Sequence, residues 1–357
     1  MDPLKLIAGC KALHIPGFDT INENGNGVTV TPLAGGLSNT LYLISVDNVE
    51  KTKIVSRLSA HAELPPGSCL LDQYQLMNAL PLSLAPRAFG CVDICGHSVS
   101  FESFVESHGV LTGTAFRTLK FASEIGIALG KMHRSNSISS FTTPSTLRSR
   151  LEMITKIAGT NFVEEANALL PISDGISDSD KEFTSKVFQS QGCCGDSLII
   201  HADSLPGNFL IHKQDESPSV QPYLSLLDFE YSISAPLIEA IGYEIGNAMC
   251  EFLYEYDEKD PPGFSKVCES STYFNSWCNA LVNGWARTIA GKSGTYECEV
   301  LERVAHAASR KGILQSHLFW ASWSFILDNR KHAATVFDYG VFSKERLCRL
   351  KEAYNLK

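Results

Sequence analysis

The segment from Leu198 to Tyr231 constrains this chain more than any other, because two short apolar runs in it each lead into acidic residues. The first run is β-prone and leads to Asp203, with Asn208 five residues further on. A Pro-Gly pair between them favours a loop that can turn both side chains toward one point. The second run ends at Asp228. The spacing therefore predicts two neighbouring strands that present these three side chains together.

These three residue types are typical of phosphoryl transfer. Asp203 can accept or orient the proton of a hydroxyl group, and the oxygen atoms of Asn208 and Asp228 suit Mg²⁺ beside the phosphates of ATP. Alone, the pattern His-x-Asp-x-x-x-x-Asn also fits a histidine and an aspartate that cap an ordinary turn. The Asp-Phe-Glu that ends an apolar strand about twenty residues later is more specific, since it resembles the Asp-Phe-Gly of protein kinases. Together the two motifs predict a small-molecule kinase.

Length and charge set the class of protein. The chain has 357 residues, which is enough for two domains or one bilobal unit, and its formal net charge is -9. A negative chain without clustered Lys and Arg is not expected to bind nucleic acid, whereas a small cationic substrate suits it. No stretch reaches the ~18 apolar residues of a membrane span, and the start lacks a basic region followed by an apolar one. We expect a cytoplasmic protein without a membrane span.

A hairpin with a glycine-containing loop is predicted near the N-terminus. Residues 27–33 alternate as a strand, and a second strand covers 41–46. Between them, Ala34-Gly35-Gly36-Leu37-Ser38-Asn39 offers backbone N–H groups that can approach a phosphate closely. A plain β-turn is the alternative explanation of the two glycines.

Two charged residues that follow are candidates for the nucleotide site. Arg57, on a predicted strand at 53–58, can point back under the glycine-containing loop. Asp72, on a predicted helix at 69–80, is its expected partner, as an acid on a kinase small-lobe helix pairs with a lysine. Either residue could equally be a solvated surface charge.

The remaining pattern predicts the two lobes. A strand at 99–105 ends in Glu102-Ser103-Phe104-Val105, the expected hinge whose backbone groups would bind adenine. An amphipathic helix is predicted at 114–133, and three more at 237–256, 271–290 and 299–330. We therefore predict a small β-rich nucleotide-binding lobe at 1–105 and a larger, mainly helical lobe at 106–357.

With these residues in place, the chain resembles the choline/ethanolamine kinase family, whose members share a bilobal protein-kinase-like α+β fold. Residues 199–211 are similar to the family's catalytic loop and 226–231 to its Ile-Asp-Phe-Glu-Tyr signature. The segments 246–256 and 316–324 continue the resemblance, which extends from about Thr31 to Tyr354.

The resemblance implies a role for each matching residue. Asp203 corresponds to the catalytic base, Asn208 and Asp228 to the magnesium ligands, and Ser38, Asn39, Arg57 and Asp72 to the nucleotide site. The implied choline pocket comprises Tyr231, Glu251, Tyr256, Trp320 and Trp323, with Phe337, Tyr339 and Phe342 near its rim. Aromatic rings around one acid suit a quaternary ammonium.

Glu251 has a particular importance in this pocket. A buried carboxylate needs a positive partner, and we expect the substrate ammonium to be that partner. Trp320 and Trp323 would ordinarily be assigned to the core, because residues three apart share a helix face.

The expected reaction is ATP- and Mg-dependent phosphorylation of choline, and of ethanolamine as a second substrate, to give phosphocholine for phospholipid synthesis. Ala202, Asp72 and Phe342 depart from the family pattern, which commonly has Asn, Glu and Tyr there. Alternatives are an ethanolamine kinase, an aminoglycoside or other amino-alcohol phosphotransferase, and a catalytically silent choline-binding pseudokinase. Because family members are often dimers, the resemblance also implies a homodimer.

Overall fold

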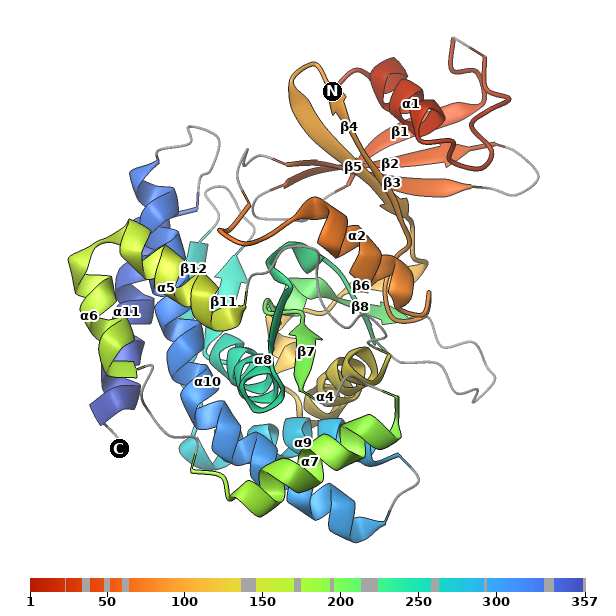
Figure 1. The fold of residues 1–357 in the computed structure, drawn as a ribbon. Coiled ribbons are helices and arrows are strands. Elements are labelled where there is room, and N and C mark those ends of the chain that lie inside the picture. Colours follow the sequence, from red (N-terminus) through yellow and green to blue (C-terminus); the bar gives the residue numbers. More distant parts are fainter. Residues whose placement is uncertain are drawn as a thin grey trace.

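The structure is a computed structural model. It describes residues 1–22, 24–33, 39–47, 52–59, 64–135, 146–169, 175–192, 196–212, 224–257, 263–291, 294–330 and 337–355. A small lobe built on a β-sheet lies at the upper right of Figure 1, and a larger, mainly helical lobe lies below it. This division agrees with the predicted small β-rich and larger helical parts. Within the described ranges, no helix combines the length and the apolar character needed to cross a membrane.

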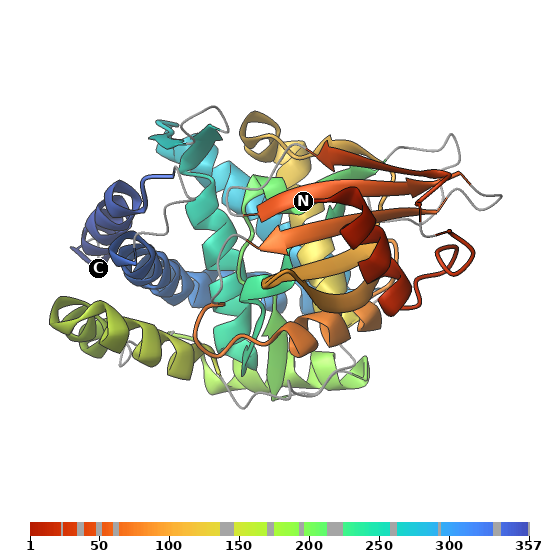
Figure 2. The same ribbon diagram turned by 90° about the horizontal axis from the view of Figure 1, so that it is seen from above.

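The small lobe is a five-stranded antiparallel sheet covered on one face by a helix. In spatial order its strands are β1 (Val28–Leu33), β2 (Asn39–Val46), β3 (Lys53–Ser59), β5 (His97–Ser103) and β4 (Ala88–Ile94). The helix is α1 (Pro3–Ala12), which lies across the sheet in Figure 2. Its buried residues Leu6, Ile7 and Cys10 share one core with sheet residues such as Phe101. This helix was not predicted from the sequence, although Asp2 caps it and Pro3 occupies its first turn.

A second helix of the N-terminal third, α2 (Leu70–Ala79), packs toward the large lobe instead (Figure 1). Its buried residues Leu76 and Met77 belong to the main core of the large lobe. Gln73 Nε2 donates a hydrogen bond of 3.5 Å to the backbone oxygen of Glu230. The helix therefore connects the small lobe to the segment that contains Asp228.

The chain crosses between the lobes just after β5. The backbone N–H groups of Ser103 and Phe104 donate to Arg87 O and Lys53 O, which keeps this segment attached to the small lobe. The next strand, β6 (Ser107–Val110), already pairs with a strand of the large lobe. The predicted boundary between residues 105 and 106 falls within this crossing, and as a division into domains it stays a prediction.

The large lobe contains helices of very different length. They are α3 (Gly113–Phe116), α4 (Leu119–Arg134), α5 (Leu147–Ala158), α6 (Thr160–Leu169), α7 (Asp178–Ser190), α8 (Leu237–Glu251), α9 (Ser271–Ala290), α10 (Thr295–Asn329) and α11 (Tyr339–Asn355). Its short strands are β6, β7 (Ser197–Ile200), β8 (Phe209–His212), β9 (Leu224–Leu226), β10 (Ile233–Pro236), β11 (Tyr254–Asp257) and β12 (Gly263–Lys266). Two single-turn 3₁₀ helices are η1 (Pro206–Asn208) and η2 (Phe229–Tyr231).

Helices α8 and α10 cross at a point where glycine is required. A Cβ atom on Gly312 would lie 1.8 Å from the backbone oxygen of Gly242, a distance that no side chain can adopt. The two backbones consequently touch, as in other close helix crossings that depend on small residues. This contact matters for the site because both helices contribute side chains to it.

Two predicted helices were too long. The helix predicted at 114–133 is interrupted between α3 and α4, where the Thr118 side chain accepts a hydrogen bond from Phe121 N and caps α4. The helix predicted at 237–256 ends at Glu251, and Tyr256 lies on β11, opposite Phe264 of β12. Tyrosines that alternate with acidic residues favour a strand with one aromatic face, which explains the difference.

Candidate active site

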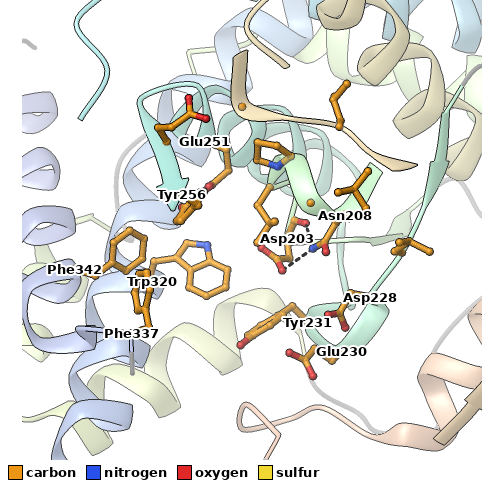
Figure 3. A pocket seen from close by; sticks show the side chains of 18 of the residues that line it. Asp203, Asn208, Asp228, Glu230, Tyr231, Glu251, Tyr256, Trp320, Phe337 and Phe342 are labelled. Carbon is orange, nitrogen blue, oxygen red and sulfur yellow. Dashed lines mark hydrogen bonds between the residues drawn. The ribbon is translucent and has the colours of Figure 1, made fainter. Parts of the chain in front are cut away.

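Two strand pairs hold the predicted catalytic segments side by side. Strand β7 pairs with β10, and β8 pairs with β9, all antiparallel. The loop after β7 contains Asp203, and the loop after β9 contains Asp228. A hydrogen bond of 2.9 Å from Leu227 N to Asn208 O joins the two loops. Asp203, Asn208 and Asp228 all line one cleft of about 500 Å³ (Figure 3).

Asp203 and Asn208 are in direct contact. Asn208 Nδ2 donates to Asp203 Oδ2 at 2.8 Å and to the Asp203 backbone oxygen at 2.9 Å. The other carboxylate oxygen of Asp203, Oδ1, is buried, and no described residue donates a hydrogen bond to it. Burial and the neighbouring carboxylates of Glu251, Asp228 and Glu230 raise the pKa of Asp203 well above its usual value. A carboxylate in such surroundings is a good proton acceptor.

The loop that contains Asp203 is held by Glu244 of α8, a residue the sequence analysis did not select. Glu244 accepts hydrogen bonds from His201 N at 2.6 Å and from Ser204 Oγ at 3.0 Å, and it is fully buried. Burial alone would raise the pKa of Glu244, but the hydrogen bond and charge of His133 and the contacts of His201 lower it instead. The nearby Asn247 Oδ1 accepts from Ser204 N at 2.8 Å. Charge-assisted bonds of this kind fix the backbone of the loop.

Ala202, one of the departures from the family pattern, has a left-handed backbone with φ of 65°. That region disfavours most residues that have a Cβ atom, including alanine. Asparagine also has a Cβ atom but tolerates the region better. The strain is accommodated because both His201 N and Ala202 N bond to Glu244.

Replacing Ala202 by glycine is therefore expected to raise the free energy of unfolding by about 0.5–1 kcal/mol, since relief of left-handed strain exceeds the entropic cost of glycine. Ala166, equally buried at 3% but inside α6, is the control. Its change to glycine should lower the free energy of unfolding by about 1 kcal/mol. Urea unfolding of the two variants measures both effects, and a loss of stability in Ala202→Gly would contradict the account of strain.

Arg57 lies in the cleft, but its partners differ from the expected one. Its guanidinium forms ion pairs with Asp228 Oδ1 at 2.5 Å and with Glu102 Oε1 at 3.5 Å. Among the described residues, its ion pairs do not include Asp72, which is buried in the first turn of α2. The register explains this, because Val55 is opposite Glu102 and so places Glu102 diagonally next to Arg57 on the same sheet face. The described ion pairs of Arg57 are thus with Asp228 and Glu102, and its pairing with Asp72 when the nucleotide is bound stays a prediction.

The expected hinge residues do not line this cleft. Glu102, Ser103, Phe104 and Val105 are absent from its walls, and the stretch Val110–Gly113 occupies the corresponding edge. The N–H groups of Ser103 and Phe104 are already used in bonds to the backbone oxygens of Arg87, just before β4, and Lys53 of β3. Ser38 lies outside the described residues, and so does the rest of the glycine-containing loop at 34–37. Asn39 begins β2, where only its backbone is described.

Aromatic side chains form the other end of the cleft (Figure 3). Tyr231 and Trp320 face each other with ring centroids 4.9 Å apart, and both line the cleft. Trp323 is different, because it is 2% exposed, belongs to the main core and donates from Nε1 to Tyr231 OH at 3.2 Å. Of the two tryptophans, Trp320 is thus the wall, while Trp323 supports Tyr231 from behind.

The rim residues also face the cleft. The structure places them on α11 and on the segment before it, in an aromatic cluster with Tyr254 and Tyr256. They are Phe337, Tyr339 and Phe342. Phe342, which replaces a usual tyrosine, packs with its ring centroid 6.2 Å from that of Tyr256.

Glu251 already has a positive partner within the protein. Its Oε1 bonds to Arg346 of α11, and its Oε2 accepts a hydrogen bond of 2.6 Å from Tyr256 OH. Glu251 is 1% exposed and Arg346 is fully buried. The expectation that the substrate ammonium is needed to compensate this carboxylate is therefore wrong.

The residues in the cleft fit a magnesium ion that is shared with phosphate groups. In the described part of the chain, no three His, Cys, Asp or Glu side chains form a complete metal site. Mg²⁺ commonly uses one or two carboxylates together with phosphate oxygens, so Asp228 and the amide oxygen of Asn208 are a sufficient protein contribution. Asp203 Oδ1, to which no described residue donates a hydrogen bond, lies in the same cleft as these two side chains.

Comparison with protein families gives the context for this geometry. The model of the family "Choline/ethanolamine kinase" matches residues 30–351, which is most of the chain. The chain belongs to the choline/ethanolamine kinase family. The resemblance seen in the sequence is thereby confirmed.

Individual relatives of this choline/ethanolamine kinase family member are distant in sequence. The chain is 26% identical to choline kinase alpha of Mus musculus over 164 residues, which are 44% of this chain and 33% of the relative. It is also 26% identical to the choline/ethanolamine kinase of Homo sapiens over 130 residues, 36% of this chain and 31% of that protein. These matches thus span about a third of each curated relative.

Solved structures show the fold more fully. The choline kinase of Cryptosporidium parvum Iowa II superposes with a TM-score of 0.68 at 19% identity, covering 99% of this chain and 96% of that one. The ethanolamine kinase of Plasmodium vivax gives 0.55 at 15% identity, covering 94% and 85%. At this level of identity the comparison shows the fold alone, and it confirms the predicted bilobal kinase-like fold.

Three residues important to the site of this family member were missed from the sequence. Glu244 and Arg346 are described above, and Arg150 of α5 is the third. It is 1% exposed and donates to the backbone oxygens of Tyr231, at 2.5 Å, and Ser232, at 3.3 Å. Burial lowers the pKa of Arg150 to about 10. All three are charged residues on helices, and what marks them is their burial. A sequence pattern does not show the burial of a charge.

Proposed function

We propose that this protein transfers the γ-phosphoryl group of ATP to the hydroxyl group of choline, with ethanolamine as a second substrate. The observation that carries the proposal is the presence, in one cleft, of Asp203, Asn208 and Asp228 at one end and the Tyr231–Trp320 aromatic wall at the other. We expect a short amino alcohol to reach from one end to the other. Its cationic head would contact the rings while its hydroxyl reaches Asp203.

The proposed reaction gives each group in the cleft a defined role. The alcohol oxygen forms a bond to the γ-phosphorus, the bond from that phosphorus to the bridging oxygen breaks, and ADP leaves. Asp203 accepts or orients the proton of the hydroxyl group, a role that its buried, acidic surroundings favour. When bound by Asn208 and Asp228, Mg²⁺ would supply charge stabilisation at the phosphates. Arg57, held by Asp228 and Glu102, would contact the nucleotide.

The experiment that tests this function is an assay of ADP formation with purified protein, ATP and Mg²⁺. Choline, ethanolamine and an aminoglycoside are added separately, and a reaction without any acceptor is the control. ADP formation that depends on choline or ethanolamine supports the proposal. Dependence on the aminoglycoside alone would indicate the alternative phosphotransferase, and binding of choline without turnover would indicate the silent pseudokinase.

Arg57→Ala should affect the nucleotide rather than the alcohol. Removing a guanidinium near the phosphates is expected to raise the KM for ATP by roughly tenfold, while the KM for choline changes by less than about threefold. Steady-state kinetics with each substrate varied in turn measures both constants. An equal rise in the two would mean that Arg57 acts on the whole cleft.

The two tryptophans should behave differently. Trp320→Ala is expected to raise the KM for choline about three- to thirtyfold, because a cation–π contact contributes ~0.5–2 kcal/mol. Trp323→Phe keeps an aromatic ring in the core, so it should lower the melting temperature but raise the KM by less than about threefold. A larger KM effect for Trp323→Phe than for Trp320→Ala would show that the wall is assigned to the wrong tryptophan.

A further inference from the structure

The feature that goes beyond the proposed function is the buried cluster of Glu251, Tyr256 and Arg346. Glu251 ends α8, Tyr256 lies on β11, and Arg346 comes from α11, 95 residues away from Glu251 in the sequence. All three line the cleft beside the aromatic wall. The cluster thus joins three separate elements at the place where a cationic head group would bind.

Both carboxylate oxygens of Glu251 are engaged within the protein. Arg346 Nη2 bonds to Oε1, and Tyr256 OH donates to Oε2 at 2.6 Å. Each oxygen already accepts from a protein donor, which reduces the acceptor capacity that remains for a ligand N–H group. The charge of Glu251 is also balanced, because the paired guanidinium carries one positive charge for one negative charge.

Arg346 is itself held by aromatic rings. Its guanidinium carbon lies 4.4 Å from the ring centroid of Tyr254 and 4.9 Å from that of Phe342. Two of its nitrogen atoms, Nε and Nη1, are buried without a hydrogen-bond partner, and Glu251 is its ion-pair partner among the described residues. The guanidinium therefore remains on Glu251, since stacking fixes its plane and no other described carboxylate pairs with it.

We propose that Arg346 determines the head-group preference of this site by occupying Glu251, so that the ammonium group is bound by aromatic rings instead of an ion pair. This inference rests on the proposed function. A quaternary ammonium has no N–H donors and so loses no hydrogen bond when the carboxylate is occupied. A primary ammonium has three N–H donors that need acceptors, so it is disfavoured in the same site. Arg346 is accordingly a positioning residue that favours choline over ethanolamine.

The test compares kcat/KM for choline and for ethanolamine in the wild-type protein and four variants. Arg346→Met removes the cation and keeps an apolar side chain against the rings, while Glu251→Gln removes the negative charge. The double variant Glu251→Gln with Arg346→Met is neutral at both positions. Arg349→Met, which removes an arginine one turn further along α11 that pairs with Glu345 and Glu352, is the matched control.

Arg346→Met should lower the ratio of choline to ethanolamine kcat/KM by about tenfold or more, because the freed carboxylate can accept bonds from a primary ammonium. The change should occur mainly in KM, as expected for a residue that affects binding. The double variant should lower kcat/KM for choline clearly less than Glu251→Gln alone does, since a neutral pair replaces a neutral ion pair and no unpaired guanidinium is left beside the ammonium. Arg349→Met should change neither value.

The double variant keeps the test decisive if Arg346→Met does not fold, since it leaves no unpaired buried charge. Its folding is checked by its melting curve, and a failure of the neutral double variant to fold would overturn the inference that the pair is replaceable.

If the folded double variant loses choline activity as strongly as Glu251→Gln alone, the carboxylate charge binds the ammonium and the inference is wrong. An unchanged substrate ratio in Arg346→Met would overturn it as well. A wild-type protein that phosphorylates neither alcohol would instead overturn the proposed function, and this inference with it.

Discussion

Replacing Asp203 by asparagine is expected to lower kcat by about 10²- to 10⁴-fold, the range that general-base positioning contributes. Asparagine keeps the shape of the side chain and its contact with Asn208, but it cannot accept the hydroxyl proton. Binding of the nucleotide should remain nearly intact, because the phosphates are expected to be held by other residues. Single-turnover kinetics together with calorimetric titration of ATP and Mg²⁺ separates the two effects.

A neighbouring substitution provides the control for this prediction. Ser204→Ala removes the hydroxyl bond to Glu244 next to Asp203 but leaves the carboxylate in place. Its effect on kcat should be much smaller than that of Asp203→Asn. If Asp203→Asn keeps close to full activity, another group accepts the proton, and the role given to Asp203 is wrong.

Asp228→Asn is expected to have the second large effect, a loss of about 10²- to 10³-fold in kcat/KM for the magnesium–nucleotide complex. The change removes a charge that faces both the predicted metal site and Arg57, whose Nη1 lies 2.5 Å from Asp228 Oδ1. Raising the Mg²⁺ concentration should recover part of the activity, because the ligand that remains is a weaker one. Titration of activity against Mg²⁺ measures this recovery.

Glu102→Gln distinguishes the two roles of Asp228. It removes the other carboxylate that pairs with Arg57, at 3.5 Å, without changing the predicted metal ligands. The variant should therefore raise the KM for ATP and leave the Mg²⁺ dependence unaltered. If Asp228→Asn and Glu102→Gln shift the Mg²⁺ dependence equally, metal binding depends on the charges around Arg57, and Asp228 is not a metal ligand.

The local catalytic geometry could be predicted from the sequence because its parts are close along the chain. Asp203 and Asn208 are separated by one short loop, and the strands that precede the two loops follow from apolar runs. An acid, an amide and a second acid that meet at one point are then typical of a phosphoryl-transfer site. The fold class also followed, since a strand-rich first third and long helices afterwards are visible in the residue pattern.

Contacts between distant elements could not be predicted in the same way. The Arg57–Glu102 pair depends on the register of β3 and β5, and a pattern within one strand does not fix that register. The Glu251–Arg346 pair joins α8 to α11, and the sequence analysis identified neither α11 nor the burial of its arginine. For Glu251 considered alone, it was reasonable to expect the substrate ammonium as its positive partner. A buried carboxylate needs only some cation, however, and in this protein Arg346 is that cation.

The side of a helix is a third limit. Trp320 and Trp323 are three residues apart, so they differ by about 60° around the helix axis. That difference is small enough to suggest one shared face, yet it separates a residue that lines the cleft from one in the core. Tyr231 contacts both tryptophans, since its ring packs against Trp320 in the cleft and its hydroxyl accepts a hydrogen bond from Trp323.

The most direct test of the central claim is ³¹P NMR of a reaction that contains the purified protein, ATP, Mg²⁺ and choline. The account predicts a phosphomonoester signal from phosphocholine that grows in equal amount with ADP, a weaker corresponding product with ethanolamine, and neither product with Asp203→Asn. ADP that forms together with inorganic phosphate, at the same rate with or without choline, would contradict it.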